Sequence, residues 1–197
     1  MNLKKEQIRS FNGQLKARGK KDEVKTIEGY FAVFNIQTEL WKGAFEEIAQ
    51  GAFDNSIKND VRALINHDST LVLGRTKSGT LKLETDEKGL KGSIIINDKD
   101  QEAINLYERV KRGDVTQCSF GFNIISEEVI NNDDGSIKWI LKEVELHEVS
   151  VCTFPAYIDT SIEARKSEVE NNKKRLLESW KKEQKEKIKN AKTNNVK

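Results

Sequence analysis

The stretch from Val115 to Ile125, VTQCSFGFNII, constrains the fold more than any other part of this sequence. Its residues alternate between apolar and polar or small, and alternation with period two is typical of a β-strand with two unlike faces. One predicted face carries Cys118, Phe120, Phe122 and Ile124, and the other carries Gln117, Ser119, Gly121 and Asn123. The pattern therefore predicts a strand with an apolar inner face and a polar, surface-facing side that carries Ser119.

Ser119 has a glycine, Gly121, as its next neighbour on the same predicted face. A glycine lets another chain approach closely, because it has no Cβ. A serine placed in this way becomes a nucleophile when a general base reaches its hydroxyl. Most serines on the polar face of a strand have no chemical role, so this stretch alone leaves both interpretations open.

The other periodic segments predict many strands and one central helix. Strands are expected at residues 25–34, 45–48, 61–68, 80–85, 89–96 and 137–154. A helix is expected from Asp98, as N-cap, through Arg112, with Gly113 after its end. Strands outnumber helices and no βαβ alternation repeats. The predicted fold class is mainly β with α, an antiparallel β-barrel flanked by helices, or a sandwich of the same strands.

The distribution of charge predicts three regions. Residues 1–24 are polar and are expected to form a loose arm, and residues 25–165 are expected to form one folded domain. Residues 166–197 hold eleven Lys and Arg against five Asp and Glu, and a basic helical or disordered tail is expected there. The rest of the chain is mildly acidic, which argues against a nucleic-acid partner. No apolar run reaches membrane-spanning length, so no membrane partner is expected.

The chain has only two histidines, His67 and His147, and histidine is the side chain best suited to act as a general base near neutral pH. His67 stands at the end of the predicted strand 61–68. A base of this kind needs an orienting partner, and Glu148 and His147 are both candidates. Strict alternation places Glu148 with Leu146 and Cys152 on an apolar face, where a carboxylate needs an internal partner. That partner is either His67 or a buried arginine such as Arg75.

Other chemistries are disfavoured by the sequence. Two histidines and two cysteines without close spacing do not make a zinc site, and no phosphate-binding or dinucleotide-binding glycine loop is present. No cofactor and no metal are therefore expected. Cys118 falls on the aromatic face of its predicted strand. Cys118 and Cys152 are both expected to be buried free thiols.

Five short motifs, in this order, resemble those of the prohead proteases of tailed bacteriophages. They are Ile65–Asp68 (INHD), Leu73–Thr76 (LGRT), Arg112–Val115 (RGDV), Cys118–Phe122 (CSFGF) and Glu148–Ala156 (EVSVCTFPA). Each motif alone has little specificity, whereas their joint order over residues 26–165 is specific. The resemblance does not extend to the N-terminal arm or the C-terminal tail.

The resemblance implies a barrel surrounded by helices, like that of the herpesvirus assemblins, and a serine endopeptidase. It implies His67 as base, Ser119 as nucleophile and Glu148 as the third member. The herpesvirus relatives use a second histidine in the third role, so His147 stays open. The implied partners are the major capsid protein, whose scaffolding segment would be cleaved, and the chain itself. The implied location is the assembling procapsid in the host cytoplasm, and a homo-oligomer is compatible with it. The alternative is a non-enzymatic capsid-assembly module on a protease-like fold.

Overall fold

The computed structural model describes residues 6–11, 13, 15–19, 23–132, 134–154, 165–166, 169–170, 174 and 177–187. Residues 1–157 and 158–197 form two separate compact units. The elements of the first unit are β1 (Gln7–Phe11), β2 (Lys16–Arg18), β3 (Thr26–Val33), β4 (Thr38–Trp41), β5 (Ala44–Ile48), β6 (Arg62–Ile65), β7 (Asp68–Arg75), β8 (Leu81–Thr85), β9 (Gly89–Ile95), α1 (Gln101–Arg112), β10 (Gln117–Asn131) and β11 (Ile137–Cys152).

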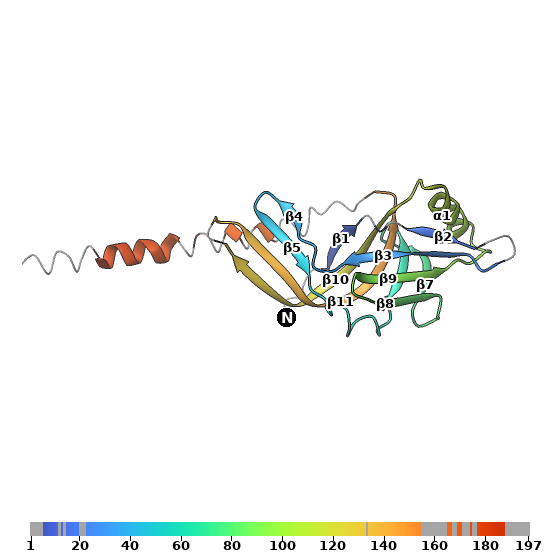
Figure 1. Cartoon of the computed structure of the whole chain (residues 1–197), viewed down its shortest axis with the longest axis horizontal. Helices are drawn as coiled ribbons and strands as arrows, with labels where there is room; N and C mark the ends of the chain where they lie inside the picture. Colours follow the sequence, from blue (N-terminus) through green and yellow to red (C-terminus); the bar gives the residue numbers. More distant parts are fainter. Residues whose placement is uncertain are drawn as a thin grey trace, which may run out of the picture. The chain divides into compact units, whose positions relative to one another are not determined.

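Two sheets make up this unit (Figure 1). The larger has the order β1-β10-β11-β5-β4, and the β6–β7 hairpin joins it where β6 pairs with β11. The smaller has the order β2-β3-β9-β8. No closed barrel is found among the described strands, and β11 pairs with both β5 and β6 in parallel. The predicted antiparallel barrel is therefore wrong, although the mainly β class is confirmed.

The long hairpin of β10 and β11 forms the central part of the larger sheet. Phe120 and Phe122 from β10 stack at 4.9 Å between ring centroids, and Phe53 meets Phe120 edge-on at 5.5 Å. All three rings are essentially inaccessible to solvent. Each buried phenylalanine contributes about 1.5–3 kcal/mol through the hydrophobic effect. The apolar face predicted for this strand is thus the centre of the core.

A β-bulge at His147 interrupts the hairpin. Gly121 lies opposite Glu148, but the next residue of β10, Phe122, lies opposite Leu146, so His147 is the extra residue on β11. Adjacent residues of β10 point to opposite faces, so Glu148 and Leu146 do as well. The prediction that they share an apolar face is therefore wrong. Glu148 lies instead on the face of Ser119 and Gly121.

Helix α1 confirms the predicted helix, with one change at its start. Asp100, not Asp98, is the N-cap, and its carboxylate accepts hydrogen bonds from the backbone N–H groups of Glu102 and Ala103. Gly113 has φ 90° at the C-terminal end, as predicted. The helix buries Leu106 and Tyr107 beside the smaller sheet, next to β2 and β3.

The N-terminal segment differs from its prediction. Within residues expected to form a loose arm, β1 pairs with β10 and β2 pairs with β3. In the second unit, residues 165–166, 169–170, 174 and 177–187 are helical. The other residues of the predicted tail, and Pro155 and Ala156 of the last motif, lie outside the described residues.

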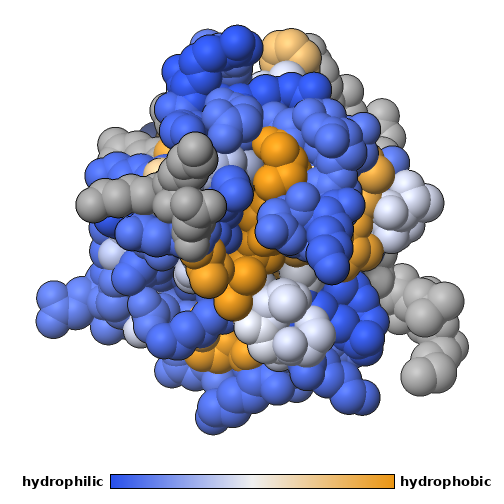
Figure 2. Space-filling view, turned by 90° about the vertical axis from the view of Figure 1, so that its right-hand side faces the viewer, coloured by the Kyte–Doolittle hydropathy of each residue, from blue (hydrophilic) through white to orange (hydrophobic). Residues whose placement is uncertain are grey.

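The face drawn in Figure 2 is mostly hydrophilic, with small, separate hydrophobic areas. No helix in the described part of the chain is long and apolar enough to cross a membrane. The surface in this view therefore offers no single large apolar patch that would indicate a binding site by itself.

Candidate active site

The β6–β7 hairpin presents His67 at its tip. Ile65 pairs with Asp68, so Asn66 and His67 alone form the turn, and both have positive φ, 50° and 62°. Two successive residues with positive φ are the mark of a type I′ hairpin turn. This conformation is uncommon for histidine. The backbone N–H of Asn66 bonds to the carbonyl of Val151, and its side-chain oxygen accepts a hydrogen bond from the Thr153 N–H.

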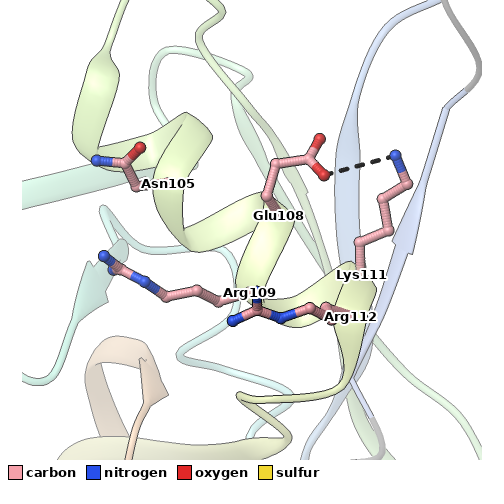
Figure 3. A pocket seen from close by; sticks show the side chains of 5 residues that line it. All are labelled: Asn105, Glu108, Arg109, Lys111 and Arg112. Atoms are coloured by element: carbon pink, nitrogen blue, oxygen red, sulfur yellow. Dashed lines mark ion pairs between the residues drawn. The ribbon is translucent and has the colours of Figure 1, made fainter.

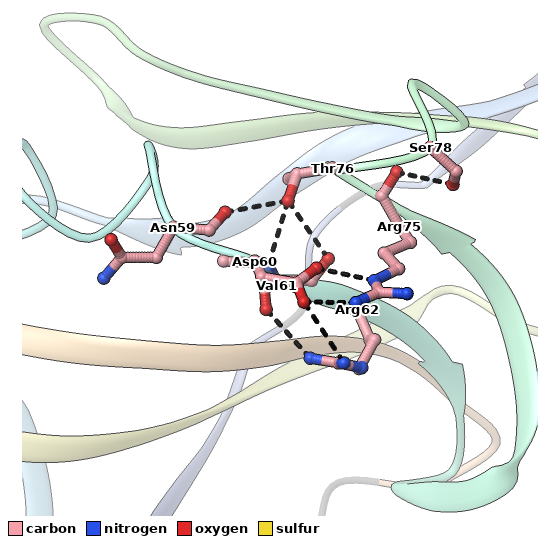
Figure 4. A network of polar contacts seen from close by, with 7 residues as sticks. All are labelled: Asn59, Asp60, Val61, Arg62, Arg75, Thr76 and Ser78. Carbon is pink, nitrogen blue, oxygen red and sulfur yellow. Dashed lines mark hydrogen bonds and ion pairs between the residues drawn. The ribbon is translucent and has the colours of Figure 1, made fainter.

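A polar network at the other end of this hairpin fixes its base (Figure 4). The guanidinium of Arg75 binds both carboxylate oxygens of Asp60, and Arg62 binds the same carboxylate at 3.3 Å. The Arg75 hydrogen bond lowers the pKa of Asp60 to about 2. Because Arg75 is engaged with Asp60, it is not the partner of Glu148, and the arginine alternative is wrong.

Glu148 and His67 are in direct contact. The distance from Glu148 Oε1 to His67 Nδ1 is 2.7 Å, and both side chains are largely buried, at 9% and 18% exposed. With Nδ1–H donating to the carboxylate, Nε2 of a neutral His67 is left to accept a proton. The structure thus brings together two of the three residues predicted for the site.

Ser150 holds this pair in place, and the sequence reasoning missed it. Its hydroxyl donates to Glu148 Oε2 at 2.6 Å and accepts a hydrogen bond from the His67 backbone N–H at 3.2 Å. Ser150 is fully buried and stands directly opposite Ser119. The signal available in the sequence was its position two residues after Glu148, on the same face of the strand.

Gly121 makes room for the carboxylate. A Cβ at this position would lie 2.6 Å from Glu148 Oε1 and 2.9 Å from a carboxylate oxygen of Glu6. Real Cβ atoms do not approach this closely, so any larger residue would displace the Glu148 side chain. The sequence indicated close approach at Gly121 but not what approaches, which is the third member of the predicted site.

Ser119 is fully buried, and the prediction that its hydroxyl faces the surface is wrong. It lies on β10 between Ser150 of β11 and Ser10 of β1. Its hydroxyl donates to the backbone carbonyl of Arg9 at 2.9 Å, and Ser10 Oγ lies 3.4 Å away. Among the described residues no hydrogen bond joins Ser119 to His67. The serine therefore lies across from Ser150, with its hydroxyl directed at β1.

The two cysteines are buried free thiols, as predicted, but only one touches the site. Cys118 points into the core, 3.0 Å from the Tyr30 carbonyl, and burial raises the pKa of its thiol. Cys152 Sγ lies 3.8 Å from His67 Nε2. Burial, and secondarily the charge of Glu148, raise the pKa of the Cys152 thiol to about 12. At neutral pH this thiol stays protonated, so it is a weak nucleophile.

His147, the chain neighbour of Glu148, takes no part in the contacts of this cluster. It is half-buried at the bulge, and its ring makes no hydrogen bond or ion pair with another described residue. The geometry therefore favours Glu148 over His147 as the residue that orients His67. No group of three metal-ligating side chains occurs within the described residues.

A cavity lies elsewhere, along α1. It has a volume of about 560 Å³ and is lined by Asn105, Glu108, Arg109, Lys111 and Arg112 (Figure 3). Figure 3 shows the ion pair of Lys111 with Glu108. Arg112 pairs with Asp114. No member of the His67 cluster lines it, so this cavity is not the candidate site.

Residues 13–175 match the family described as caudovirus prohead serine protease. This chain belongs to that family. It is 32% identical over 159 residues to the prohead protease of Enterobacteria phage HK97, covering 78% of this chain and 66% of the relative. It is 29% identical over 132 residues to that of Escherichia phage T5, covering 67% and 55%. The chain thus spans about half to two thirds of these relatives.

Among solved structures, the bacteriophage T4 capsid assembly protease aligns with a TM-score of 0.47 and 10% identity, covering 75% of this chain and 98% of the other. The family match begins after β1 (Gln7–Phe11), so the strand that receives the Ser119 hydroxyl precedes the matched residues.

Proposed function

We propose that this chain is a serine endopeptidase of phage capsid maturation, with Ser119 as nucleophile, His67 as base and Glu148 as the orienting carboxylate. The observation that carries the proposal is the 2.7 Å contact of Glu148 with His67 Nδ1, held by Ser150 directly opposite Ser119. Membership of the prohead serine protease family supports it. Nucleophile, base and orienting acid are the parts that acyl transfer requires.

In the proposed reaction, Ser119 Oγ attacks the carbonyl carbon of the scissile peptide, and its proton passes to His67 Nε2. The imidazolium is stabilised by Glu148, which already accepts the Nδ1–H. His67 then gives the proton to the leaving amine as the C–N bond breaks. Water, deprotonated by the same nitrogen, releases the acyl group and restores Ser119. For these steps to occur, the Ser119 hydroxyl has to rotate away from the Arg9 carbonyl and toward β11.

Cys152 is the competing nucleophile, because its sulfur lies 3.8 Å from His67 Nε2. Its raised pKa argues against that role, since the reactive form is the thiolate. Replacement of each residue separates the two assignments. With Ser119 as nucleophile, Cys152→Ala retains a covalent intermediate on residue 119, whereas Ser119→Ala forms none.

The proposed substrate is the scaffolding segment of the major capsid protein, together with the chain itself, inside the assembling procapsid in the host cytoplasm. The test is incubation of the purified chain with its capsid precursor, followed by sequencing of the new termini. Cleavage by the native chain but not by folded Ser119→Ala supports the proposal. Binding to the precursor without cleavage by either chain would instead establish the non-enzymatic assembly module.

The catalytic body is proposed to comprise residues 25–165 together with β1 and β2, which pair with its strands. The basic residues 166–197 are proposed to hold the enzyme to an acidic scaffold or capsid interior. A tether raises the local concentration of enzyme at its substrate without changing the chemistry. A chain truncated after Arg165 should cleave a short peptide at the full-length rate and yet be packaged poorly into proheads. Equal packaging of both chains would rule out the tether.

A further inference from the structure

Strand β1 covers the serine that the proposed reaction needs. It forms the edge of the larger sheet and pairs antiparallel with β10 through five residues, from Gln7 opposite Phe122 to Phe11 opposite Cys118. Ser10 stands directly opposite Ser119, and the Arg9 carbonyl accepts the Ser119 hydroxyl. Ser119 is completely inaccessible to solvent in this arrangement.

Buried charges hold β1 in its place. The Arg9 guanidinium binds both carboxylate oxygens of Glu46 on β5, one of them at 2.8 Å, and lies 5.6 Å from the centre of the Phe122 ring. The Arg9 and Glu46 side chains are only 8% and 4% exposed. A bidentate, buried pair of this kind fixes both position and register, because each partner would be costly to leave without the other.

The backbone of β1 runs along β10 as an extended peptide substrate would. If β1 leaves, β10 becomes the edge of the sheet and its N–H and C=O groups over residues 118–122 lose their partners on that side. An extended peptide restores those hydrogen bonds by adding a strand to the edge. A peptide in the register of β1 would bring a backbone carbonyl within contact distance of Ser119, as Arg9 does at 2.9 Å.

We propose that the β10 edge facing β1 is the binding site for the extended peptide substrate, and that β1 occupies this site and keeps the free enzyme inactive. This inference rests on the proposed serine protease function and adds the location of the substrate strand and a means of restraint. The activity of the free chain is then proportional to the fraction of molecules in which β1 has left β10. Displacement by a substrate strand restores it.

The test is to fix β1 on β10 in the intact chain with a disulfide. Cys118 lies directly opposite Phe11, and its sulfur is 3.4 Å from the Phe11 carbonyl, so Phe11→Cys places a second thiol beside it. The readout is the rate at which a fluorophosphonate probe labels Ser119, located by peptide mass spectrometry. In that reaction the serine oxygen bonds to phosphorus, fluoride leaves and His67 takes the proton. The probe needs no knowledge of the cleavage sequence.

We expect oxidation of Phe11→Cys to slow labelling by about tenfold or more, and reduction to restore it. Phe11→Ala is the matched control: it removes the same ring without adding a thiol, so oxidation should leave its labelling rate unchanged. Equal labelling of the oxidised and reduced Phe11→Cys chain, with the disulfide confirmed by thiol titration, would overturn the inference.

A second variant tests the restraint without a disulfide. Glu46→Gln removes the charge that holds Arg9 but keeps an amide oxygen to accept one hydrogen bond, so the chain should fold while β1 leaves more readily. Labelling several-fold faster than in the native chain is expected, and labelling at the native rate counts against the inference. A chain whose Ser119 is labelled in no variant and no redox state would overturn the nucleophile assignment, whereas labelling that ignores the state of β1 overturns only its inhibitory role.

Discussion

The two sides of Ser119 are built from different materials. On the β11 side, Ser150, Glu148 and His67 form a polar cluster in which each contact orients the next, and all three lie within the residues that match the prohead protease family. On the β1 side, a backbone carbonyl and a buried ion pair hold a strand that precedes those residues. The first side can move a proton, whereas the second can only occupy space and hold the hydroxyl. The proposed proton transfer and the proposed restraint thus lie on opposite sides of one strand.

Ser119→Ala should have the largest effect, because it removes the proposed nucleophile, which stands between the two sides. Cleavage of the capsid precursor should fall by about 10³-fold or more. The free energy of unfolding should fall by only about 1 kcal/mol, the worth of the hydrogen bond to Arg9. Precursor cleavage and urea unfolding measure the two. Ser10→Ala, which alters the β1 side alone, is the control and should remain active; full-rate cleavage by Ser119→Ala would refute the nucleophile assignment.

Glu148→Gln should have the second-largest effect and lower turnover by about 10²–10⁴-fold. An amide neither fixes the His67 tautomer nor stabilises its protonated form. His147→Gln is the matched control from the neighbouring residue, and its turnover should change by less than about twofold. Steady-state cleavage of a peptide derived from the mapped site measures both, and a crippled His147→Gln would move the third role to that histidine.

Gly121→Ala sharpens the comparison, because it disturbs the β11 side without replacing any polar side chain. The new Cβ would collide with Glu148 Oε1, so the carboxylate has to move away from His67. We expect turnover to fall by about 10–100-fold, in line with the cost of misplacing a positioned group by 1 Å. The substitution should slow turnover more than it affects KM; a variant with native turnover would show that the carboxylate can relax without leaving His67.

Cys118→Ala should change stability rather than activity, because its side chain lies on the core face of β10. Trimming this buried group should lower the free energy of unfolding by roughly 1–2 kcal/mol. Turnover per folded molecule should stay within about twofold of the native chain. Loss of turnover in a stably folded variant would mean that the two faces of this strand are not independent.

The smallest effect is expected from Asp60→Asn, because this carboxylate binds Arg75 and Arg62 and no member of the His67 cluster. The Arg75 hydrogen bond holds the folded pKa of Asp60 near 2, below the ordinary value of 3.8. A depressed carboxyl pKa stabilises the fold above the unfolded pKa, and that contribution is lost as pH falls from about 4 to about 2. The native chain should therefore be slightly more stable than Asp60→Asn at pH 7 and lose this advantage at pH 2. An unchanged difference across thermal unfolding curves at these pH values would argue against the Arg75 contact as its source.

Sequence reasoning found the parts of the site that depend on local pattern. Alternation correctly turned Cys118 and Phe120 inward and put Ser119 on the opposite face with Gly121. The sequence placed His67 at the end of the predicted strand 61–68. In the structure β6 ends earlier, at Ile65, and His67 lies in the turn before β7, a strand that was not predicted. The joint order of short motifs led to the right family. These features are visible because strand alternation and turn chemistry act over a few residues.

The features that were missed depend on distant partners. The bulge at His147 reverses alternation, and nothing in the neighbouring residues announces it. Strand β1 has a charged residue, Arg9, in its centre. The burial of Arg9 depends on an ion pair with Glu46, which lies 37 residues further along the chain. The antiparallel barrel was predicted wrongly for the same reason, because β6 pairs in parallel with β11, a segment that is distant in the sequence. Sequence patterns describe one segment at a time, whereas the bulge, the buried ion pair and the parallel pairing each depend on two segments together.

That parallel pairing has a consequence for how the active centre comes into being. Ser119 and Glu148 belong to one local hairpin, β10–β11, and His67 belongs to another, β6–β7. Hairpins form early because their contacts are close in sequence, while a parallel pairing between segments some 80 residues apart forms late. A newly made chain should therefore hold its serine and its acid for a time without its base. Proteolytic competence would arise in a late step, when the two hairpins dock. The pairing of β1 with β10 joins residues still further apart, such as Arg9 and Ser119, so it should form no earlier than that step.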